Sequence, residues 1–234
     1  MDARRLQYLK ALDIDVWARR VGAEPVVEPA AVAAPVAAPA TGDPTASLDW
    51  TALETAVRGC THCSLSKTRT QTVFGVGDRA AQWMVIGEAP GADEDREGEP
   101  FVGRAGQLLT SMLTAMGFKR EQVFIANILK CRPPGNRDPS PEEVAHCMPY
   151  LERQIELVNP RMILCVGRIA AQNLLKTDTP IGKLRGQLHR LPGTERPVVV
   201  TYHPAYLLRS PGEKRKAWAD LVFAMNTAEG LAPA

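Results

Sequence analysis

The sequence predicts an α/β fold in three layers, with a central, mostly parallel four-stranded sheet covered by helices on both faces. Two observations support this prediction. Short apolar runs, partly β-branched or aromatic, alternate along the chain with segments of helical pattern. Such alternation is typical of a parallel sheet whose strands are connected by helices. The chain has 234 residues and a hydrophobic content of 45%, which is enough for one well-buried core.

The predicted strands are four apolar runs at residues 83–86, 123–126, 162–166 and 198–202, each of which stops at a Gly, a polar residue or a His. The predicted helices lie at about 104–116, 141–158, 169–175 and 213–225. The second helix has a strong start, because Ser140 can cap it, Pro141 takes its first position and two glutamates fill its first turn. We expect Pro149 to kink or restart this helix.

The first 46 residues differ in composition from the rest of the chain. Residues 1–22 place apolar residues among arginines, and we expect a short helical interaction segment there. Residues 23–46 are almost entirely Ala, Pro, Val, Thr and Gly, which predicts a linker because such small side chains cannot form a core. The folded domain is then expected at 47–227, followed by a tail at 228–234.

The formal net charge is only +2, so overall charge does not indicate a nucleic-acid partner. Basic residues nevertheless gather at 119–137, 183–190 and 209–216, beside Gly- or Pro-rich stretches. This pattern favours basic loops on one rim, although an ordinary solvated surface would explain it equally well. Residues 1–20 lack the apolar centre of a signal peptide, and no run approaches the ~18 apolar residues of a membrane span. We therefore expect a cytoplasmic protein.

Five cysteines in such a chain favour metal binding over a disulfide framework. Cys60 and Cys63 form a close pair in a turn, Cys131 follows a predicted strand, and Cys147 falls in a predicted helix. Four thiolates from three places can hold either zinc or an iron–sulfur cluster, and the spacing alone leaves both open. Cys165, inside an apolar run, is assigned to the core.

Polar motifs follow three of the predicted strands. They read GEAPGADE at 87–94 with GEPFVGRAG at 98–106, NILKCRPPGNR at 127–137, and YHPAYLLR at 202–209. Because ligands bind at the carboxyl ends of the strands in such sheets, these motifs predict one functional site.

This ordered set of motifs, with the four cysteines interleaved, resembles the family 4 (iron–sulfur) uracil-DNA glycosylases over residues 60–221. The resemblance implies a uracil-DNA glycosylase-like fold. It also implies an enzyme that rotates uracil, the product of cytosine deamination, out of DNA and hydrolyses its N-glycosidic bond to start base excision repair. In that family, cysteines at the positions of Cys60, Cys63, Cys131 and Cys147 hold a 4Fe–4S cluster of structural role.

The resemblance also assigns roles to the strand-end residues. Catalytic roles fall to Glu88, Glu94, Asn136 and His203, with His203 neutral and stabilising the departing uracil anion. The uracil pocket is assigned to Ala89, Phe101 and Asn127. DNA contacts are assigned to Arg132, Arg137, Leu207, Leu208 and Arg209, with the two leucines as a wedge that fills the vacated stack. Family 1 enzymes carry an aspartate where this chain has Ala89, so the usual water-activating carboxylate is missing, as it is throughout family 4.

Residues 3–20 are similar to the N-terminal segment of the psi subunit of DNA polymerase III, which docks on the chi subunit. This likeness predicts a replisome partner, with an ordinary surface helix as the alternative. We expect a monomer associated with the nucleoid. Two other functions remain open: a non-catalytic accessory protein of the same fold, and a zinc-bearing Rossmann-like nucleotide binder. The second lacks a G-x-G-x-x-G turn after any predicted strand.

Overall fold

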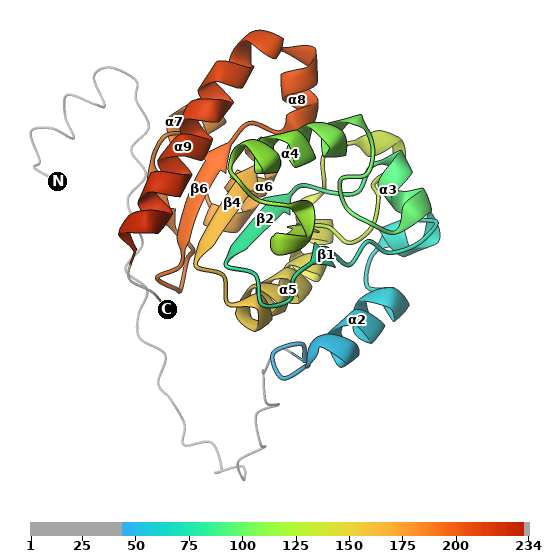
Figure 1. Cartoon of the computed structure of the whole chain (residues 1–234). Helices are drawn as coiled ribbons and strands as arrows, with labels where there is room; N and C mark the ends of the chain where they lie inside the picture. The colour runs from blue at the N-terminus through green and yellow to red at the C-terminus, as the bar shows by residue number, and fades with distance from the viewer. Residues whose placement is uncertain (1–43, 232–234) are drawn as a thin grey trace, which may run out of the picture. The chain divides into compact units, whose positions relative to one another are not determined.

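A computed structural model describes residues 44–231 and contains one six-stranded sheet (Figure 1). The strands are β1 (Val76–Gly77), β2 (Trp83–Gly87), β3 (Phe124–Asn127), β4 (Met162–Val166), β5 (Leu188–Arg190) and β6 (Pro197–Thr201). Their order across the sheet is β1-β3-β2-β4-β6-β5. The four central strands are parallel, whereas β1 and β5 pair antiparallel at the two edges.

The helices that connect these strands are short or of medium length. The α-helices are α2 (Trp50–Gly59), α3 (Ala92–Glu97), α4 (Arg104–Ala115), α5 (Pro141–Val158), α6 (Arg168–Leu175), α7 (Ile181–Leu184), α8 (Pro204–Arg209) and α9 (Lys214–Gly230). Single 3₁₀ turns are η1 (Ser64–Lys67), η2 (Arg120–Gln122), η3 (Pro134–Asn136) and η4 (Pro211–Glu213). Among the described residues, no helix is both long and apolar enough to cross a membrane.

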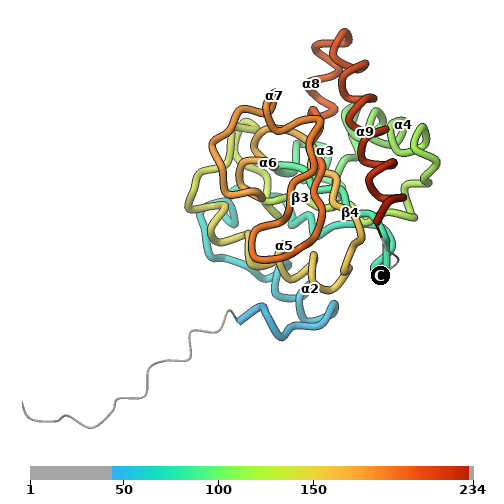
Figure 2. The backbone as a smooth tube through the Cα atoms, turned by 90° about the vertical axis from the view of Figure 1, so that its left-hand side faces the viewer, coloured from blue at the N-terminus to red at the C-terminus, as the bar shows by residue number. Residues whose placement is uncertain are grey.

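The sheet has a hydrophobic core on each face because successive side chains of a strand point to opposite sides. In β2, Met84 and Ile86 join the core that includes α5 and α6, whereas Trp83 and Val85 join the core that includes α4 and α9. All four side chains are nearly inaccessible to solvent. Figures 1 and 2 show α4 and α9 on one side of the sheet and α5 on the other. The predicted three-layer α/β fold is confirmed.

The structure differs from the prediction at the edges of the sheet and in the helices. The predicted four parallel strands form the centre, and the two edge strands were missed because they have only two or three residues. Helix α5 runs through Pro149 without restarting, and α9 continues to Gly230. The predicted segment 1–22 and nearly all of the linker 23–46 lie outside the described residues.

The parallel strands place their carboxyl ends at one edge of the sheet. Gly87 at the end of β2 is in register with Asn127 at the end of β3, and Val166 of β4 is in register with Thr201 of β6. The loops that leave β2, β3 and β6 therefore converge, and these loops carry the polar motifs.

Candidate active site

A cleft of about 410 Å³ lies at this carboxyl edge. It brings together all seven residues that were expected to act in catalysis or to bind uracil: Glu88, Ala89, Glu94, Phe101, Asn127, Asn136 and His203. Arg137 and Arg209, two of the predicted DNA-binding residues, also line it. Residues separated by more than a hundred positions in the sequence thus form one site.

Phe101 forms a buried wall of the cleft in a strained backbone conformation. Its φ is +57°, which is uncommon for a residue with a side chain, and strain of this kind is concentrated at functional sites. Two glycines allow the conformation. A Cβ at Gly106 would lie 1.7 Å from the Phe101 carbonyl oxygen, and one at Gly87 would lie 2.5 Å from Phe101 Cζ. The ring of Phe101 stacks at 5.6 Å and 30° on that of His203.

Asn127 presents a buried polar atom that nothing in the described part of the chain satisfies. The residue is 2% exposed, and its side-chain oxygen Oδ1 has no hydrogen-bond partner there. Buried acceptors are nearly always paired, and an unpaired one costs about 1–3 kcal/mol. Because Asn127 lines the cleft, the unused acceptor is available to a ligand that carries an N–H group.

His203 is held as a neutral imidazole. Burial, with a smaller effect from the charge of Arg209, lowers its pKa to about 4. Its Nδ1 accepts a hydrogen bond from the main-chain N–H of Ala205 at 3.1 Å. A neutral ring whose Nδ1 accepts must carry its proton on Nε2, so His203 offers an N–H donor at that atom.

The carboxyl group of Glu88 has a pKa that is shifted toward neutral pH. Burial and, to a smaller extent, the like charge of Asp138 raise its pKa to about 7, and the charge of Arg168 opposes this shift. Arg168 donates to Asp138 at 2.8 Å at the exposed mouth of the cleft. A carboxyl group with a pKa near 7 is suited to handling a proton at neutral pH.

Glu94 lines the cleft, but its carboxylate already serves the main chain. It accepts N–H groups from Gly91 at 3.0 Å, Val102 at 3.1 Å and Gly103 at 3.4 Å. The first bond satisfies the N–H of Gly91, the N-cap residue of α3, and the others tie the loop after β2 to the loop that carries Phe101. The contacts of Glu94 are those of a group that positions Phe101.

Asn136 is exposed in η3, on the loop after β3, with a positive φ of 54°. Its amide oxygen accepts from Arg132 Nε at 2.7 Å. Arg132 does not line the cleft, and its link to the cleft is this hydrogen bond to Asn136, which does line it. Arg137 lines the cleft and forms a two-bond ion pair with the buried Glu143, which neutralises much of its charge.

The two leucines of the predicted wedge lie in different environments. Leu207 is 1% exposed and packs in the core with Leu221 and Leu109, a burial that disfavours its predicted role as a wedge. Leu208 is half-buried on the neighbouring position of α8, and Arg209 beside it is exposed. In a helix, successive residues point in directions about 100° apart, so Leu207 can be buried in the core while Leu208 beside it stays half-buried.

The four predicted ligand cysteines are near one another. Cys60 and Cys63 flank the turn after α2, Cys131 follows β3, and Cys147 is buried in α5. Cys63 and Cys60 raise the pKa of Cys131, and Cys131 and Cys63 contribute to that of Cys147, which burial raises to about 12. Among the described residues, no three His, Cys, Asp or Glu side chains converge as the ligands of a single metal ion would.

A hydrogen-bond donor already points at one of the sulfur atoms. Arg69 donates from Nη1 to Cys131 Sγ at 2.9 Å and from Nη2 to the Cys60 carbonyl at 2.9 Å. Donors of this kind stabilise thiolates and tune the clusters that thiolates bind. Cys165 lies in the core with a raised pKa, as expected of a packing residue.

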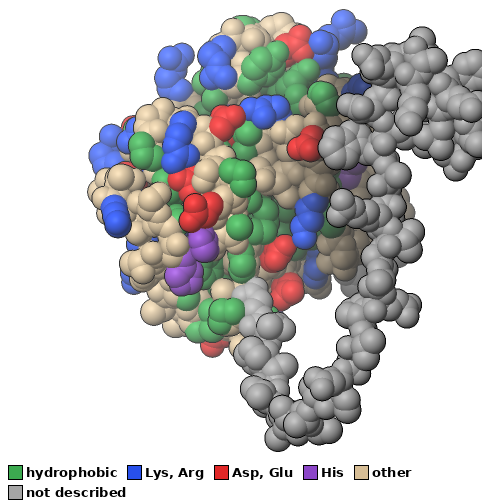
Figure 3. All heavy atoms as spheres, turned by 180° about the vertical axis from the view of Figure 1, so that it is seen from behind, with side chains coloured by type: hydrophobic (Ala, Val, Ile, Leu, Met, Phe, Trp, Pro, Cys, Tyr) green, Lys and Arg blue, Asp and Glu red, His purple; other side chains and the backbone are tan. Residues whose placement is uncertain are grey.

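The predicted basic rim is only partly present. Lys130 is 1% exposed, and Arg120 is half-buried and donates to the Pro100 carbonyl, so both turn inward. The face in Figure 3 shows basic side chains interspersed with acidic and apolar ones. The sequence analysis also missed Asp138 and Arg168, because only the folded chain shows that they adjoin the site.

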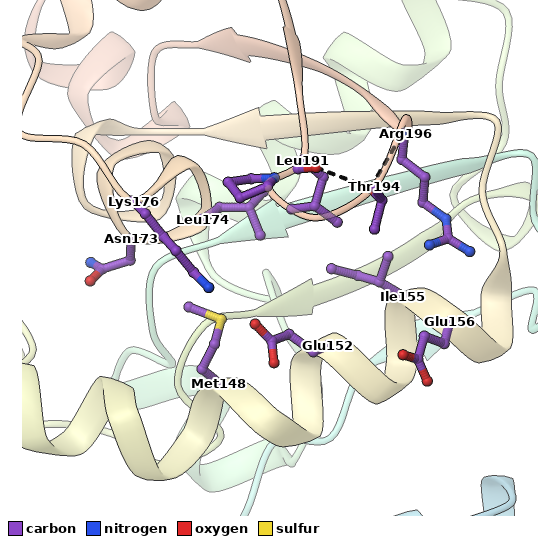
Figure 4. Close-up of a pocket in the computed structure, with 11 residues that line it drawn as sticks. Met148, Glu152, Ile155, Glu156, Asn173, Leu174, Lys176, Leu191, Thr194 and Arg196 are labelled. Carbon is purple, nitrogen blue, oxygen red and sulfur yellow. Dashed lines mark hydrogen bonds between the residues drawn. The ribbon is translucent and has the colours of Figure 1, made fainter. Parts of the chain in front are cut away.

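A second cavity lies between α5, the end of α6 and the loop before β6 (Figure 4). Glu152 and Glu156 form one wall, and Lys176 and Arg196 belong to the other. It opens near the amino end of β6, away from the strand-end motifs. Its dashed hydrogen bonds join only neighbouring loop residues, Thr194 with Leu191 and Arg196. We assign no function to it.

Comparison with known proteins first identifies the superfamily of this chain. Residues 74–222 match the model of the uracil DNA glycosylase superfamily, and this match covers well over half of the chain and the whole cleft.

Individual relatives show which type of uracil-DNA glycosylase this chain resembles most strongly among those compared. The chain is 49% identical to the type-4 uracil-DNA glycosylase of Archaeoglobus fulgidus over 170 residues, which cover 70% of this chain and 85% of the relative. It is 44% identical to the type-4 enzyme of Thermotoga maritima over 155 residues, covering 66% and 80%. Identity to a type-5 uracil-DNA glycosylase of Pyrobaculum aerophilum is 32%, covering 56% and 64%. This chain belongs to the type-4 uracil-DNA glycosylases.

Proposed function

We propose that this protein excises uracil from DNA by hydrolysing the N-glycosidic bond, as the first step of base excision repair, with the cleft at the carboxyl edge as its active site. The observation that carries this proposal is the buried Oδ1 of Asn127, which has no partner in the described part of the chain. Uracil has the N3–H group that this acceptor requires.

Recognition follows from the donor and acceptor pattern of the base. Asn127 accepts from uracil N3–H and donates from its amide nitrogen to O4. Cytosine has an acceptor at N3 and a donor at the 4-position, so it would leave both groups unpaired at roughly 1–3 kcal/mol each. Phe101 stacks on the base, a contact of about 1–3 kcal/mol, and Ala89 contributes to the wall of the pocket.

The leaving group is stabilised by His203. Bond cleavage gives a sugar oxocarbenium ion and a uracil anion, with negative charge on O2. The Nε2–H of the neutral His203 ring donates to this oxygen, and its interaction strengthens as the charge develops. A neutral donor does not lose its proton to the anion as readily as an imidazolium would.

The attacking water is positioned by Glu88 and Asn136. Ionised Glu88 accepts a proton of the water, and Asn136 orients the water at the cleft mouth. Because the leaving group is a stabilised anion, a weak base is sufficient. Glu94 acts indirectly, since its three N–H bonds hold the loop of Phe101.

DNA binding uses groups around the cleft. Arg209 and Arg137 contact phosphates, while Arg132 steadies the loop through Asn136. Leu208 fills the space in the stack that the extruded nucleotide leaves.

The four cysteines fit a 4Fe–4S cluster, which would tie the Cys60 turn, the loop after β3 and α5 together beside the cleft. This proposal is supported by the four thiols lying near enough for the charges of Cys60 and Cys63 to affect the pKa of Cys131, and those of Cys131 and Cys63 to affect that of Cys147. Ultraviolet–visible absorption of the purified protein tests this.

The proposed docking of residues 1–20 on a replication protein rests on sequence alone, because those residues lie outside the described part. A pull-down with this segment that recovers no replication protein would contradict it.

Activity is tested with single- and double-stranded oligonucleotides that contain one uracil, followed by alkali. Strand scission is expected, with loss in His203→Ala and Asn127→Ala and with DNA binding retained. Intact strands despite DNA binding would favour a non-catalytic accessory protein.

A further inference from the structure

Lys130 is a fully buried lysine that neither the catalytic cleft nor the cysteine ligands account for. It is 1% exposed, yet within the described part of the chain it has no carboxylate partner. Its Nζ donates to the main-chain oxygen of Asn127 at 2.9 Å and to Gln154 Oε1 at 2.6 Å. Burying a lysine side chain among neutral acceptors is costly, so a lysine at this place in the fold calls for a specific role.

The same residue adjoins the cysteine site through the main chain and through α5. Cys131 is its direct neighbour in the sequence. Gln154, which accepts from its Nζ, lies on α5, the helix that also carries Cys147. Lys130 therefore links the segment of one ligand cysteine and the helix of another to the main chain of the uracil-reading residue.

The surroundings of Lys130 are rigid. Gln154, which is 0% exposed in α5, accepts from Nζ and donates its own Nε2 to the Phe74 carbonyl at 2.9 Å. The Lys130 carbonyl accepts from Val73 N at 2.8 Å. These bonds fix the position of Nζ, and Nζ in turn fixes the peptide of Asn127 at the end of β3. The position of that peptide sets the direction in which the unpaired Oδ1 of Asn127 points.

We propose that Lys130 is a positioning residue that couples the cysteine site to the Asn127 side chain, so that an intact cysteine site holds the pocket ready for uracil. This inference rests on the proposed function, because it uses the roles of Asn127 and of the cluster. In this proposal, the five-residue segment from Asn127 to Cys131 supplies one pocket residue and one ligand, and it also couples the two sites.

The test compares Lys130→Met with wild type in the cluster-loaded protein, using free uracil as the probe. We expect the inhibition constant of free uracil to rise about tenfold, because a misplaced amide loses much of its hydrogen bonding, while kcat falls less. The reduction potential of the cluster should also shift, since the segment that ends at Cys131 loses the hydrogen bonds of Nζ that hold it. A residue that only fills space would move neither quantity.

Wild-type protein gives a second test that does not depend on the variant's folding. Coupling between two sites is reciprocal, so saturating uracil should shift the cluster's reduction potential in wild type and leave it unchanged in Lys130→Met. If Lys130→Met does not fold, Gln154→Leu replaces it, with a smaller rise in the uracil inhibition constant expected. Lys176→Met, in the cavity of Figure 4, is the matched control and should behave as wild type.

Asn127→Ala separates the two proposals. If it leaves the uracil inhibition constant unchanged, the proposed pocket is wrong. If it weakens uracil binding while Lys130→Met retains the wild-type constant, or if wild type shows no uracil-dependent shift in potential, the pocket stands and the coupling is overturned.

Discussion

The cleft and the cysteine site adjoin each other along the chain, yet they differ in whether their polar atoms have hydrogen-bond partners. In the cleft, Asn127 keeps a buried oxygen without a partner in the described residues. At the cysteine site, an N–H group of Arg69 already bonds the sulfur of Cys131. A substrate site must leave groups unsatisfied, whereas a structural centre gains from a satisfied shell. Substitutions in the cleft should therefore change mainly catalysis, and those at the cysteine site should change mainly stability.

The largest expected effect tests this contrast directly. His203→Ala should lower the single-turnover rate by about 10²–10³-fold, as loss of one donor to a developing anion does. Its visible absorption should match that of wild type, and its midpoint of thermal unfolding should fall only slightly, through loss of the hydrogen bond from Ala205 N–H at the start of α8. Cys147→Ala should lose the visible absorption and unfold at lower temperature, because α5 is no longer tied to the loop after β3. Equal loss of stability in both variants would contradict the contrast.

Gly87→Ala should give the next largest effect. A Cβ at this position would lie 2.5 Å from both Asn127 Oδ1 and Phe101 Cζ, so the pocket must distort. Overpacking of this kind costs about 1–3 kcal/mol, and if the pocket pays this cost on binding uracil, the inhibition constant rises about 5- to 150-fold. The matched control is Gly182→Ala, whose Cβ would meet nothing within 4 Å. Similar inhibition constants for the two variants would show that the pocket tolerates the methyl group.

The sequence predicted the centre of the molecule better than its edges, for physical reasons. The four parallel strands are buried on both faces and therefore appear as continuous apolar runs, whereas β1 and β5 are short and partly exposed. The cleft was predicted because its motifs follow strand ends. Burial of individual polar residues was not, since Lys130 has the same charge as a surface lysine and only the fold turns it inward. For the same reason, Leu207 and Leu208 could not be told apart.

The pH dependence of the rate reports on Glu88. Its pKa is raised to about 7, so the ionised form accumulates as the pH rises through that value, and the rate should rise with it. His203, with a pKa of about 4, stays neutral over this range. Asp138 raises the pKa of Glu88 and Arg168 lowers it. Asp138→Asn should move the rise in rate to lower pH, and Arg168→Gln should move it to higher pH.

Single-turnover rates measured against pH check this prediction, with Glu88→Gln as the control that should lose the rise altogether. If the rise in rate persists in Glu88→Gln, another group supplies it. An unchanged midpoint in Asp138→Asn would show that the ion pair at the cleft mouth does not act on Glu88.

The smallest expected effect concerns the wedge and extends the contrast to α8. Leu208→Ala should lower the rate on double-stranded DNA several-fold and leave the rate on single strands near that of wild type, because only a duplex has a stack to fill. Leu207→Ala should instead destabilise the fold by about 2–5 kcal/mol, since it removes a buried leucine from the core of α8 and α9. The ratio of duplex to single-strand rates in the two variants, measured below their unfolding temperatures, separates the roles. A changed ratio in Leu207→Ala with none in Leu208→Ala would mean that α8 repacks on DNA and presents the buried leucine to the stack.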